Sequence, residues 1–254
     1  MEDLTKSDES EFTEEVFSFP PVRIAVVAHK ENDWFQESVA SFANLNYLDK
    51  QLTVLTTGQM EWVEPIVSQY FPDAEILEVD PEAGLGANFN AVLSNHDEPA
   101  FYLFCHHDVA LAPDALRLMV EESYRSNAAV VGPKVVNWER PNELLDVGNV
   151  MNSLAVAVQR VEAGEIDQEQ FDSVEQVFAV SNTAFLVRAD LFRALGGFDE
   201  EMGMFGEDLD FCWRAQIAGG KIMVVPGAIA RHRDESGEYQ TNPKRSRLME
   251  RHRL

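Results

Sequence analysis

The chain alternates short apolar segments with amphipathic ones, and no other feature restricts its fold as strongly. The first apolar segment, VRIAVVA at residues 22–28, is rich in β-branched residues and has a single charged position. Such a segment is typical of a strand that is covered on both faces. A capping-box pattern follows at Asp33, and Phe35, Val39 and Phe42 then recur at the spacing of a helix that buries one face.

The same alternation of strand and helix continues along the chain. Strands are predicted at residues 51–56, 75–79 and 101–105, and helices at residues 61–70 and 113–123. The segment AGLGANFNAVLSN, which precedes the strand at residues 101–105, is typical of a loop that enters a helix. We therefore predict an α/β fold with a single domain, in which a mostly parallel, doubly wound central sheet carries helices on both faces.

The second half of the chain is less regular, and glycines punctuate it. Its predicted elements are a strand at residues 130–136 interrupted by Gly132 and Pro133, a strand-like segment at residues 176–188 that bends at Ser181 and Asn182, helices at residues 189–195 and 207–218, and a strand at residues 221–225. We assign all of them to the same domain, because no internal repeat or low-complexity linker separates them.

The two ends of the chain differ in composition from the middle. Residues 1–20 are acidic and polar and are predicted to be a mobile tail, whereas residues 21–235 form the folded domain. Residues 236–254 are either a basic tail that can associate with a membrane surface or the start of a further region. Since the chain has no signal-peptide pattern and no apolar run near the roughly 20 residues that span a bilayer, we predict a cytoplasmic protein.

Acidic residues strongly outnumber basic ones. The chain has 44 Asp and Glu against 20 Lys and Arg, which gives a formal net charge of −24. A surface of this sign repels nucleic-acid phosphates, so we exclude nucleic acid as a general partner. An anionic substrate would need a divalent cation or backbone N–H groups to offset its charge. The two cysteines, Cys105 and Cys212, lie in apolar surroundings and are predicted to be buried free thiols.

Three polar residues directly follow the apolar strand at residues 101–105. They are His106, His107 and Asp108, and a helix start follows at Pro113. In open α/β sheets, ligands bind at the carboxyl ends of the strands. A carboxylate there can ligate a hard divalent cation, and imidazoles can join it or hydrogen-bond a phosphate. The alternative is a polar strand end with no role in binding.

A pair of acids, Glu207 and Asp208, opens the helix at residues 207–218 within the segment FGEDLDFCWR. Acids in the first turn of a helix interact favourably with its dipole, and this structural role alone can account for them. The loop before them can instead bring a carboxylate into the same cleft as Asp108. There it would act as a general base toward an alcohol.

Two further features are weak signals by themselves. His232 follows the apolar segment VVPGAIA, and it completes a metal site only if the fold brings it to Asp108. Gly84 and Gly86 precede a predicted helix, where they either allow close backbone approach to a phosphate or form an ordinary turn. The chain has neither the six-residue dinucleotide-binding pattern nor a P-loop motif.

In this order, these segments resemble the family 2 glycosyltransferases with a GT-A fold, especially their actinobacterial-type cell-envelope members. The resemblance covers roughly residues 22–233 and rests on the segments AVVAHKENDWFQESVASF, AGLGANFN, FCHHDVALAPDAL, VVGPKV, LFRALGGFDEEMGMFGEDLDFCWRAQIAGG and VVPGAIARH. The segment FGEDLDFCWR after GGFDE is the most specific of them.

The resemblance implies a role for each chemical group singled out above. The HHD segment lies where the family carries its DxD-like motif, so Asp108 would bind Mg²⁺ or Mn²⁺ that bridges the donor diphosphate. His106 would replace the first acid of that motif, and His232 would supply a further metal contact. Asp208 would match the catalytic base, with Glu207 beside it.

The resemblance also implies which residues surround the nucleotide donor. Ala28, His29 and Glu31, at the end of the first strand, would border the nucleotide. Gly86 and Asn90 would belong to a donor-side loop.

The chain departs from the family pattern at the end of its second strand. Family members commonly carry an acid there that contacts the nucleobase, whereas this chain has the segment LTTG, with Thr56 or Thr57 at that point. Thr56 is therefore the expected neighbour of the nucleobase, and the identity of the base stays open.

Taken together, the resemblance implies an inverting glycosyltransferase that moves a hexosyl or deoxyhexosyl group from a nucleotide-diphosphate sugar to a hydroxyl of a saccharide or lipid-linked acceptor. Its pathway would be the synthesis of cell-envelope polysaccharide or glycolipid. One alternative is a non-catalytic nucleotide-sugar-binding or scaffolding domain with the same fold. Another is a metal-dependent hydrolase that uses His106, His107, Asp108 and His232.

Overall fold

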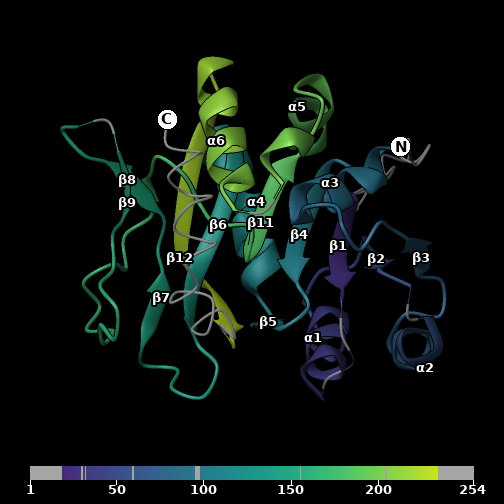
Figure 1. Ribbon diagram of the computed structural model, residues 1–254. Helices are drawn as coiled ribbons and strands as arrows, with labels where there is room; N and C mark the ends of the chain where they lie inside the picture. Colours follow the sequence, from purple (N-terminus) through teal and green to yellow (C-terminus); the bar gives the residue numbers. More distant parts are fainter. Residues whose placement is uncertain are drawn as a thin grey trace, which may run out of the picture.

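The central sheet of the computed structural model has ten strands and carries helices on both faces (Figure 1). The structure describes residues 19–29, 31, 33–58, 60–94, 98–154, 156–203 and 205–233. Residues 1–18 of the predicted acidic tail and the whole predicted basic segment at residues 236–254 lie outside these ranges. Within the described ranges, no helix is both long and apolar enough to pass through a bilayer.

Strands and helices alternate through the first half of the chain, which confirms the predicted α/β class. In chain order the elements are β1 (Val22–Ala28), α1 (Asp33–Ala43), β2 (Lys50–Thr56), α2 (Met60–Tyr70), β3 (Glu75–Glu78), α3 (Leu85–Phe89), the 3₁₀ helix η1 (Asn90–Ser94), β4 (Phe101–His106), β5 (Val109–Leu111), α4 (Ala115–Ser126), β6 (Ala128–Asn137), β7 (Leu144–Asp146), β8 (Asn149–Met151), β9 (Ala157–Gln159), β10 (Glu175–Gln176), β11 (Ala184–Arg188), α5 (Ala189–Ala194), the 3₁₀ helix η2 (Glu200–Met202), α6 (Glu207–Ile217) and β12 (Lys221–His232).

Strands β4, β1, β2 and β3 form a continuous parallel part of the sheet. Every residue of β1 is buried, as expected for a strand with helices over both faces. The register pairs Val27 of β1 with His106 of β4, and Ala28 of β1 with Thr56 of β2. The carboxyl ends of these three strands therefore lie together at one edge of the sheet.

The rest of the sheet mixes strand directions. Strand β11 lies antiparallel between β4 and β6, so it begins at Ala184 opposite Cys105, near the end of β4. Strand β12 runs parallel to β6, and its last residue, His232, pairs with Val109 of the antiparallel strand β5. The start of β11, which is antiparallel to β4, and the end of β12, which runs in the same direction as β4, therefore lie at the edge at which β4 ends.

The predicted interruption at Gly132 and Pro133 is wrong, because β6 runs through both residues. A Cβ atom on Gly132 would lie 2.7 Å from the Cβ atom of Val180, so glycine makes room for this neighbour inside the strand. Pro133 pairs with Val225 immediately before a register shift in β12. A strand can accept proline at such an irregularity, since the missing N–H leaves no ladder bond unmade.

Two other predicted strands have different limits in the structure. The segment at residues 176–188 divides into β10 and β11, because Val177 still bonds to Ile222 of β12, whereas Phe178 and Ala179 bond instead to Asn149. The predicted bend at Ser181 and Asn182 lies in this irregular stretch. Strand β12 does not stop at residue 225 but continues to His232, because β5 and β6 supply partners beyond the register shift.

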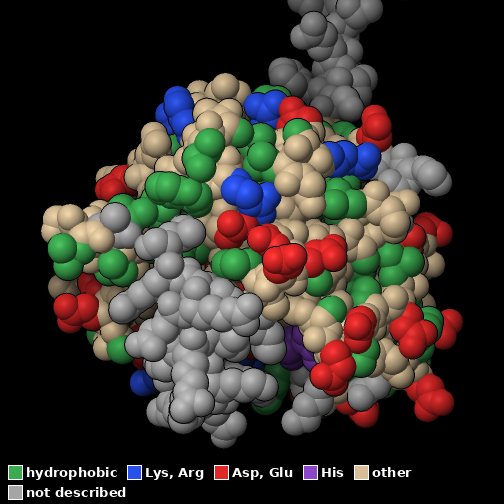
Figure 2. Space-filling view, turned by 45° about the horizontal axis from the view of Figure 1, so that its top comes forward, with side chains coloured by type: hydrophobic (Ala, Val, Ile, Leu, Met, Phe, Trp, Pro, Cys, Tyr) green, Lys and Arg blue, Asp and Glu red, His purple; other side chains and the backbone are tan. Residues whose placement is uncertain are grey.

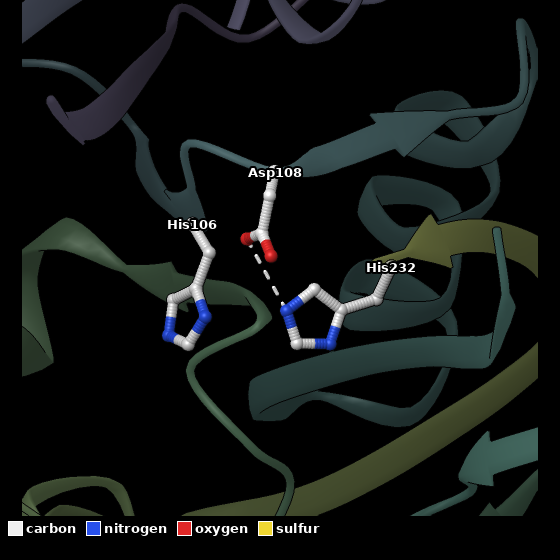
Figure 3. Close-up of side chains that lie close together, drawn as sticks. All are labelled: His106, Asp108 and His232. Atoms are coloured by element: carbon white, nitrogen blue, oxygen red, sulfur yellow. Dashed lines mark ion pairs between the residues drawn. The ribbon is translucent and has the colours of Figure 1, made fainter. Parts of the chain in front are cut away.

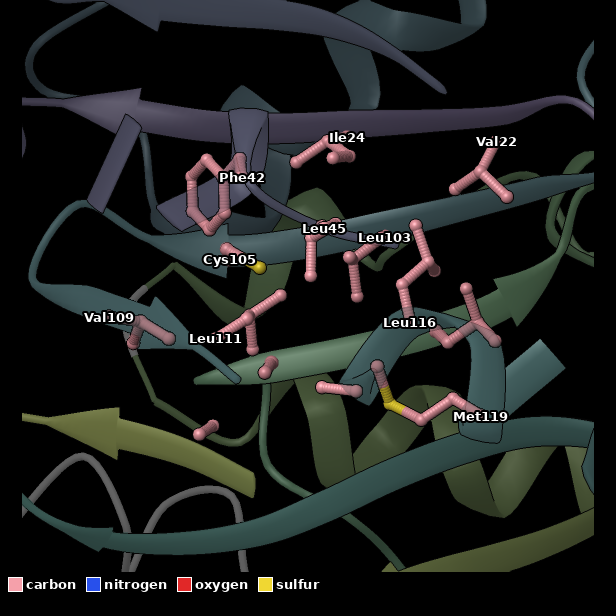
Figure 4. Packing of buried hydrophobic residues seen from close by; sticks show 14 of the residues in the cluster. Val22, Ile24, Phe42, Leu45, Leu103, Cys105, Val109, Leu111, Leu116 and Met119 are labelled. Carbon is pink, nitrogen blue, oxygen red and sulfur yellow. The ribbon is translucent and has the colours of Figure 1, made fainter. Parts of the chain in front are cut away.

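Two apolar layers hold the helices against the sheet. One lies on the side of α1, α2 and α4, and Figure 4 shows part of it, where Phe42 and Leu45 approach Leu103 and Cys105 of β4. The other lies under α3, α5 and α6 and includes a cluster of mutually contacting phenylalanines: Phe89, Phe104, Phe185, Phe192, Phe198 and Phe211. This cluster anchors the start of α6. Both cysteines are free and buried, as predicted.

Candidate functional site

Three side chains that are far apart in the sequence meet at the end of β4. His106 is the last residue of β4, Asp108 follows in the turn to β5, and His232 ends β12. One potential ligand atom from each residue lies within 4.8 Å of the others (Figure 3). Nε2 of His232 lies 3.2 Å from Oδ1 of Asp108, and the two imidazole rings are 5.4 Å apart between centroids. We call these three residues the HDH cluster.

Electrostatics keep Asp108 and His106 in the protonation states that bind a metal. Burial favours the neutral form of Asp108, but the hydrogen bond from His232 and the neighbouring imidazoles outweigh it and hold the pKa of this carboxyl well below its usual range. Burial, and then the proximity of His232, lower the pKa of His106 to about 4. At neutral pH the cluster therefore offers an ionised carboxylate and a neutral imidazole, which is the donor chemistry that divalent cations require.

The predicted acid pair occupies the first turn of α6. Glu207 is 3% exposed, whereas Asp208 is only partly buried. Burial, and then the charge of Asp208, raise the pKa of Glu207 to about 7, and burial also raises the pKa of Asp208. Among the described residues, Oε2 of Glu207 has no hydrogen-bond partner. The helix dipole favours acids at this position, but burial raises both pKa values in spite of it, and the charge of Asp208 adds to the rise for Glu207.

Asn182 joins the acid pair to the HDH cluster. Its side-chain Oδ1 lies 3.0 Å from Nε2 of His106, and its Nδ2 donates to Oε1 of Glu207 at 2.8 Å. Its backbone N–H donates to Oδ2 of Asp208 at 3.2 Å. The sequence indicated only a bend at this residue, although three consecutive polar residues inside an otherwise apolar segment were a usable signal.

Another acid near the pair, Asp146, is buried but carries no signal in the sequence. Asp146, in β7, is 8% exposed and accepts a hydrogen bond from the backbone N–H of Gly148. Burial is the first cause that raises its pKa, and the charge of Asp208 is a further one. Nothing in the sequence around Asp146 separates it from an ordinary surface acid, because its burial depends on the pairing of β7 with β6.

The residues expected to border the nucleotide lie along the same edge of the sheet. Ala28 and Thr56 end adjacent strands and are both buried. His29 follows β1 and is exposed, with its ring 6.1 Å from the ring of His107 between centroids. Glu31 is also exposed, beyond the end of β1. The structure therefore brings these positions to one edge, and their contact with a nucleotide stays a prediction.

Gly86 and Asn90 lie behind the acid pair. A Cβ atom on Gly86 would lie 2.9 Å from Cβ of Phe198 and 3.1 Å from Cβ of Glu207, so glycine is needed for the close packing of α3 against α6. Asn90 donates to the carbonyl oxygen of Phe198 and accepts a bond from its N–H, at 2.8 and 2.9 Å. Both residues thus support the loop that leads into α6, and a contact with the donor stays a prediction for them.

The face drawn in Figure 2 has the sign expected from the composition. On the face drawn in Figure 2, acidic side chains are more frequent than basic ones, and a histidine is visible low on this face beside the grey atoms. An anionic ligand that approaches such a surface is repelled at long range. A cation held by the HDH cluster would provide the local compensation.

The raised pKa of Glu207 predicts how the stability of the protein depends on pH. The pKa of the Glu207 carboxyl is about 7 in the folded chain and 4.5 when unperturbed. Its contribution to stability is therefore fully present below pH 4.5 and is lost as the pH rises from 4.5 through 7. This shift of the pKa corresponds to about 3 kcal/mol of unfolding free energy. We expect Glu207→Gln to match the wild type near pH 4.5 and to be more stable at pH 8, as measured by urea unfolding.

Glu64→Gln is the matched control, since Glu64 is exposed on α2. It should leave the dependence of the unfolding free energy on pH unchanged. The prediction is wrong if Glu207→Gln has the same pH dependence as the wild type.

Comparisons with known proteins agree with this architecture. A family model described as glycosyltransferase like family 2 matches residues 20–252. A segment of 53 residues, 21% of this chain, is 42% identical to the Pre-mycofactocin glycosyltransferase of Mycobacterium tuberculosis and covers 11% of that protein.

Solved structures share the fold at low sequence identity. The crystal structure of GalNAc-T7 with UDP, GalNAc and Mn²⁺ matches with a TM-score of 0.68 and 12% identity, over 84% of this chain and 43% of that one. The crystal structure of S. aureus TarS matches with a TM-score of 0.61 and 16% identity, over 86% of this chain and 38% of that one. The chain thus spans less than half the length of either protein, and the likeness shows the fold alone.

Proposed function

Because this chain belongs to the glycosyltransferase-like family 2, we propose that it is an inverting glycosyltransferase that uses a nucleotide-diphosphate sugar as donor. The acceptor is a hydroxyl of a saccharide or a lipid-linked molecule. The transferred sugar is a hexosyl or deoxyhexosyl group, and the product belongs to a cell-envelope polysaccharide or glycolipid. The resemblance of the motifs to actinobacterial-type cell-envelope members supports this part of the proposal, as does the mycobacterial relative.

One observation carries the proposal: the HDH cluster and the acid pair lie at the same edge of the sheet and share Asn182 as a hydrogen-bonding partner. A cation-binding group and a general base are the two components that transfer to a hydroxyl needs. The match to a structure that contains UDP and Mn²⁺ supports a nucleotide donor and a divalent cation, here Mg²⁺ or Mn²⁺.

In the proposed reaction the HDH cluster would hold the cation, which when bound offsets negative charge on the departing nucleoside diphosphate. Asp208 accepts the proton of the acceptor hydroxyl as that oxygen forms a bond to the anomeric carbon. The bond from the anomeric carbon to the diphosphate breaks in the same step, on the opposite face, so the configuration inverts. Glu207 lies beside Asp208, and the charge of Asp208 adds to burial in raising the pKa of Glu207.

Ala28, His29, Glu31 and Thr56 would border the nucleotide at the ends of β1 and β2. Thr56 replaces the acid that the family commonly carries there, and it is fully buried, so no carboxylate would contact the nucleobase from this position. We place the protein in the cytoplasm, at the inner face of the membrane if the basic segment at residues 236–254 binds lipid.

A thermal-shift screen of nucleoside diphosphates and their sugars, with and without Mn²⁺, tests the proposed donor. We expect the nucleotides of one base, and not those of the others, to stabilise the protein, and to do so only when Mn²⁺ is present. A ligand at a hundredfold excess over its Kd adds about 2.7 kcal/mol, or roughly 5–10 °C in Tm for a domain of this size. The same donor should then release its nucleoside diphosphate when an acceptor is added.

The other outcomes of this screen identify the alternatives. Stabilisation by a nucleotide sugar with no release of nucleoside diphosphate would favour a non-catalytic binding domain. The presence of Thr56 where the family commonly carries an acid supports this alternative. Stabilisation by Mn²⁺ alone, with no nucleotide effect, would favour a metal-dependent hydrolase.

A further inference from the structure

Asn182 is almost completely enclosed between two groups with different chemistry. It is 7% exposed and lies in the irregular segment just before β11. The backbone around it is fixed, since the N–H of His106 donates to the carbonyl oxygen of Thr183 at 3.2 Å and Ser181 donates to the hydroxyl of Thr183 at 2.8 Å. The position of the Asn182 amide relative to His106 is therefore set by two strands that are paired in the sheet.

The contact with Glu207 determines the orientation of the Asn182 amide. At pH 8, above its pKa of about 7, Glu207 is a carboxylate that only accepts hydrogen bonds, so the amide nitrogen must be the atom that faces its Oε1, at 2.8 Å. Rotating the amide by half a turn would place two oxygens against each other in a buried position. The amide oxygen consequently faces His106, with Oδ1 3.0 Å from Nε2.

The orientation of the amide in turn determines which nitrogen of His106 carries the proton. An amide oxygen only accepts, so Nε2 of His106 must be protonated and donate to it. In the opposite tautomer, two acceptors would face each other away from water, which is costly. Figure 3 shows that the other ring nitrogen, Nδ1, is turned toward Asp108 and His232.

We propose that Asn182 is a positioning residue that holds neutral His106 with its proton on Nε2, so that the lone pair of Nδ1 faces Asp108 and His232. Metal-binding histidines depend on such a partner at their second nitrogen to fix the tautomer and the ring orientation. The metal-binding part of this inference rests on the proposed function, which places a cation at the HDH cluster. In that case Asn182 links a metal ligand, His106, to the acid pair through its hydrogen bonds.

Two variants of Asn182 separate hydrogen bonding from space filling. Asn182→Asp keeps an acceptor for His106, whereas Asn182→Leu keeps a similar volume and removes it. Asn46→Leu is the matched control, because Asn46 is exposed and its side chain donates to Asp114 far from the cluster.

The first measurement is the tautomer of His106 in the metal-free protein at pH 8, from long-range proton–nitrogen NMR correlations of ¹⁵N-histidine-labelled chain. The signal is assigned by its loss in His106→Gln. We expect proton on Nε2 in the wild type, in Asn182→Asp and in Asn46→Leu, and a mixture of tautomers or proton on Nδ1 in Asn182→Leu.

Proton on Nδ1 in the wild type would overturn the proposal without any variant, and so would an unchanged tautomer in Asn182→Leu. The wild-type spectrum therefore decides the matter even if Asn182→Leu does not fold.

The second measurement is Mn²⁺ affinity without donor, from electron paramagnetic resonance of the free ion. Loss of a partner of this kind should weaken binding roughly 10–100-fold in Asn182→Leu. If the wild type shows the expected tautomer but binds no Mn²⁺, the metal step of the proposed function fails while the assignment of Asn182 stands. The two failures are thus distinguishable.

Discussion

Asp208→Asn is expected to lose sugar transfer almost completely while it still binds the donor. A carboxamide has nearly the same shape as the carboxylate and can still accept the bond from the N–H of Asn182, but it cannot take a proton from an acceptor hydroxyl. We expect kcat to fall by about 10²–10⁴-fold, which is the usual contribution of a general base. Donor affinity should stay the same, because Asp208 is not part of the HDH cluster.

Release of nucleoside diphosphate measures the turnover, and titration calorimetry measures the binding of the donor. Asp210→Asn is the matched control on the same helix, where Asp210 pairs with Arg214 at 2.7 Å. It should retain turnover. Undiminished turnover in Asp208→Asn would remove this residue from the role of base, and equal losses in both variants would point to damage to α6 instead.

Asp108→Asn is expected to abolish the dependence of donor binding on the metal. The carboxylate lies between the two imidazoles of the HDH cluster and carries its only negative charge, and its low pKa keeps it ionised over the working pH range. Loss of an indirect partner of a metal ligand already weakens metal binding roughly 10–100-fold, so loss of this charge should exceed about 100-fold. Calorimetry with Mn²⁺, and with Mn²⁺ plus the donor identified by the thermal-shift screen, measures the effect.

Asn is chosen at this position because its oxygen can still accept the hydrogen bond from His232, so the fold should be maintained. Asp114→Asn is the control, since Asp114 is exposed near the start of α4 and bonds to Asn46 and Arg117. It should bind Mn²⁺ like the wild type. Unchanged Mn²⁺ affinity in Asp108→Asn would exclude the HDH cluster as the metal site.

Local patterns predicted most of the regular structure. The β-branched run of β1 and the helical spacing of Phe35, Val39 and Phe42 depend on neighbouring residues alone, and the structure buries all of them. The predicted interruption of the strand at residues 130–136 was wrong, because contacts with residues far away in the sequence determine whether that strand continues. Gly132 and Pro133 remain inside β6 because Val180 and the irregular part of β12 accommodate them, and no local pattern shows either contact.

The same division applies to the candidate site. His106 and Asp108 are two residues apart, and their place at a strand end was visible from the apolar run before them. His232 was a weak signal by itself, and it reaches Asp108 only because β12 continues past its register shift to pair with β5. The sequence marked Asn182 only as a bend and did not mark Asp146 at all, since burial and hydrogen-bond partners make them unusual, and both arise from strand pairing.

The α/β class, the parallel strands at the start of the chain and the family could all be predicted from the order of residues, because they follow from short-range periodicity and from motifs in a given order. The sharing of Asn182 by the HDH cluster and the acid pair, and the rise of the Glu207 pKa to about 7, are properties of the folded chain alone. These properties depend on distances of a few ångströms between segments separated by tens of residues. They also depend on the exclusion of water, which no single segment can achieve.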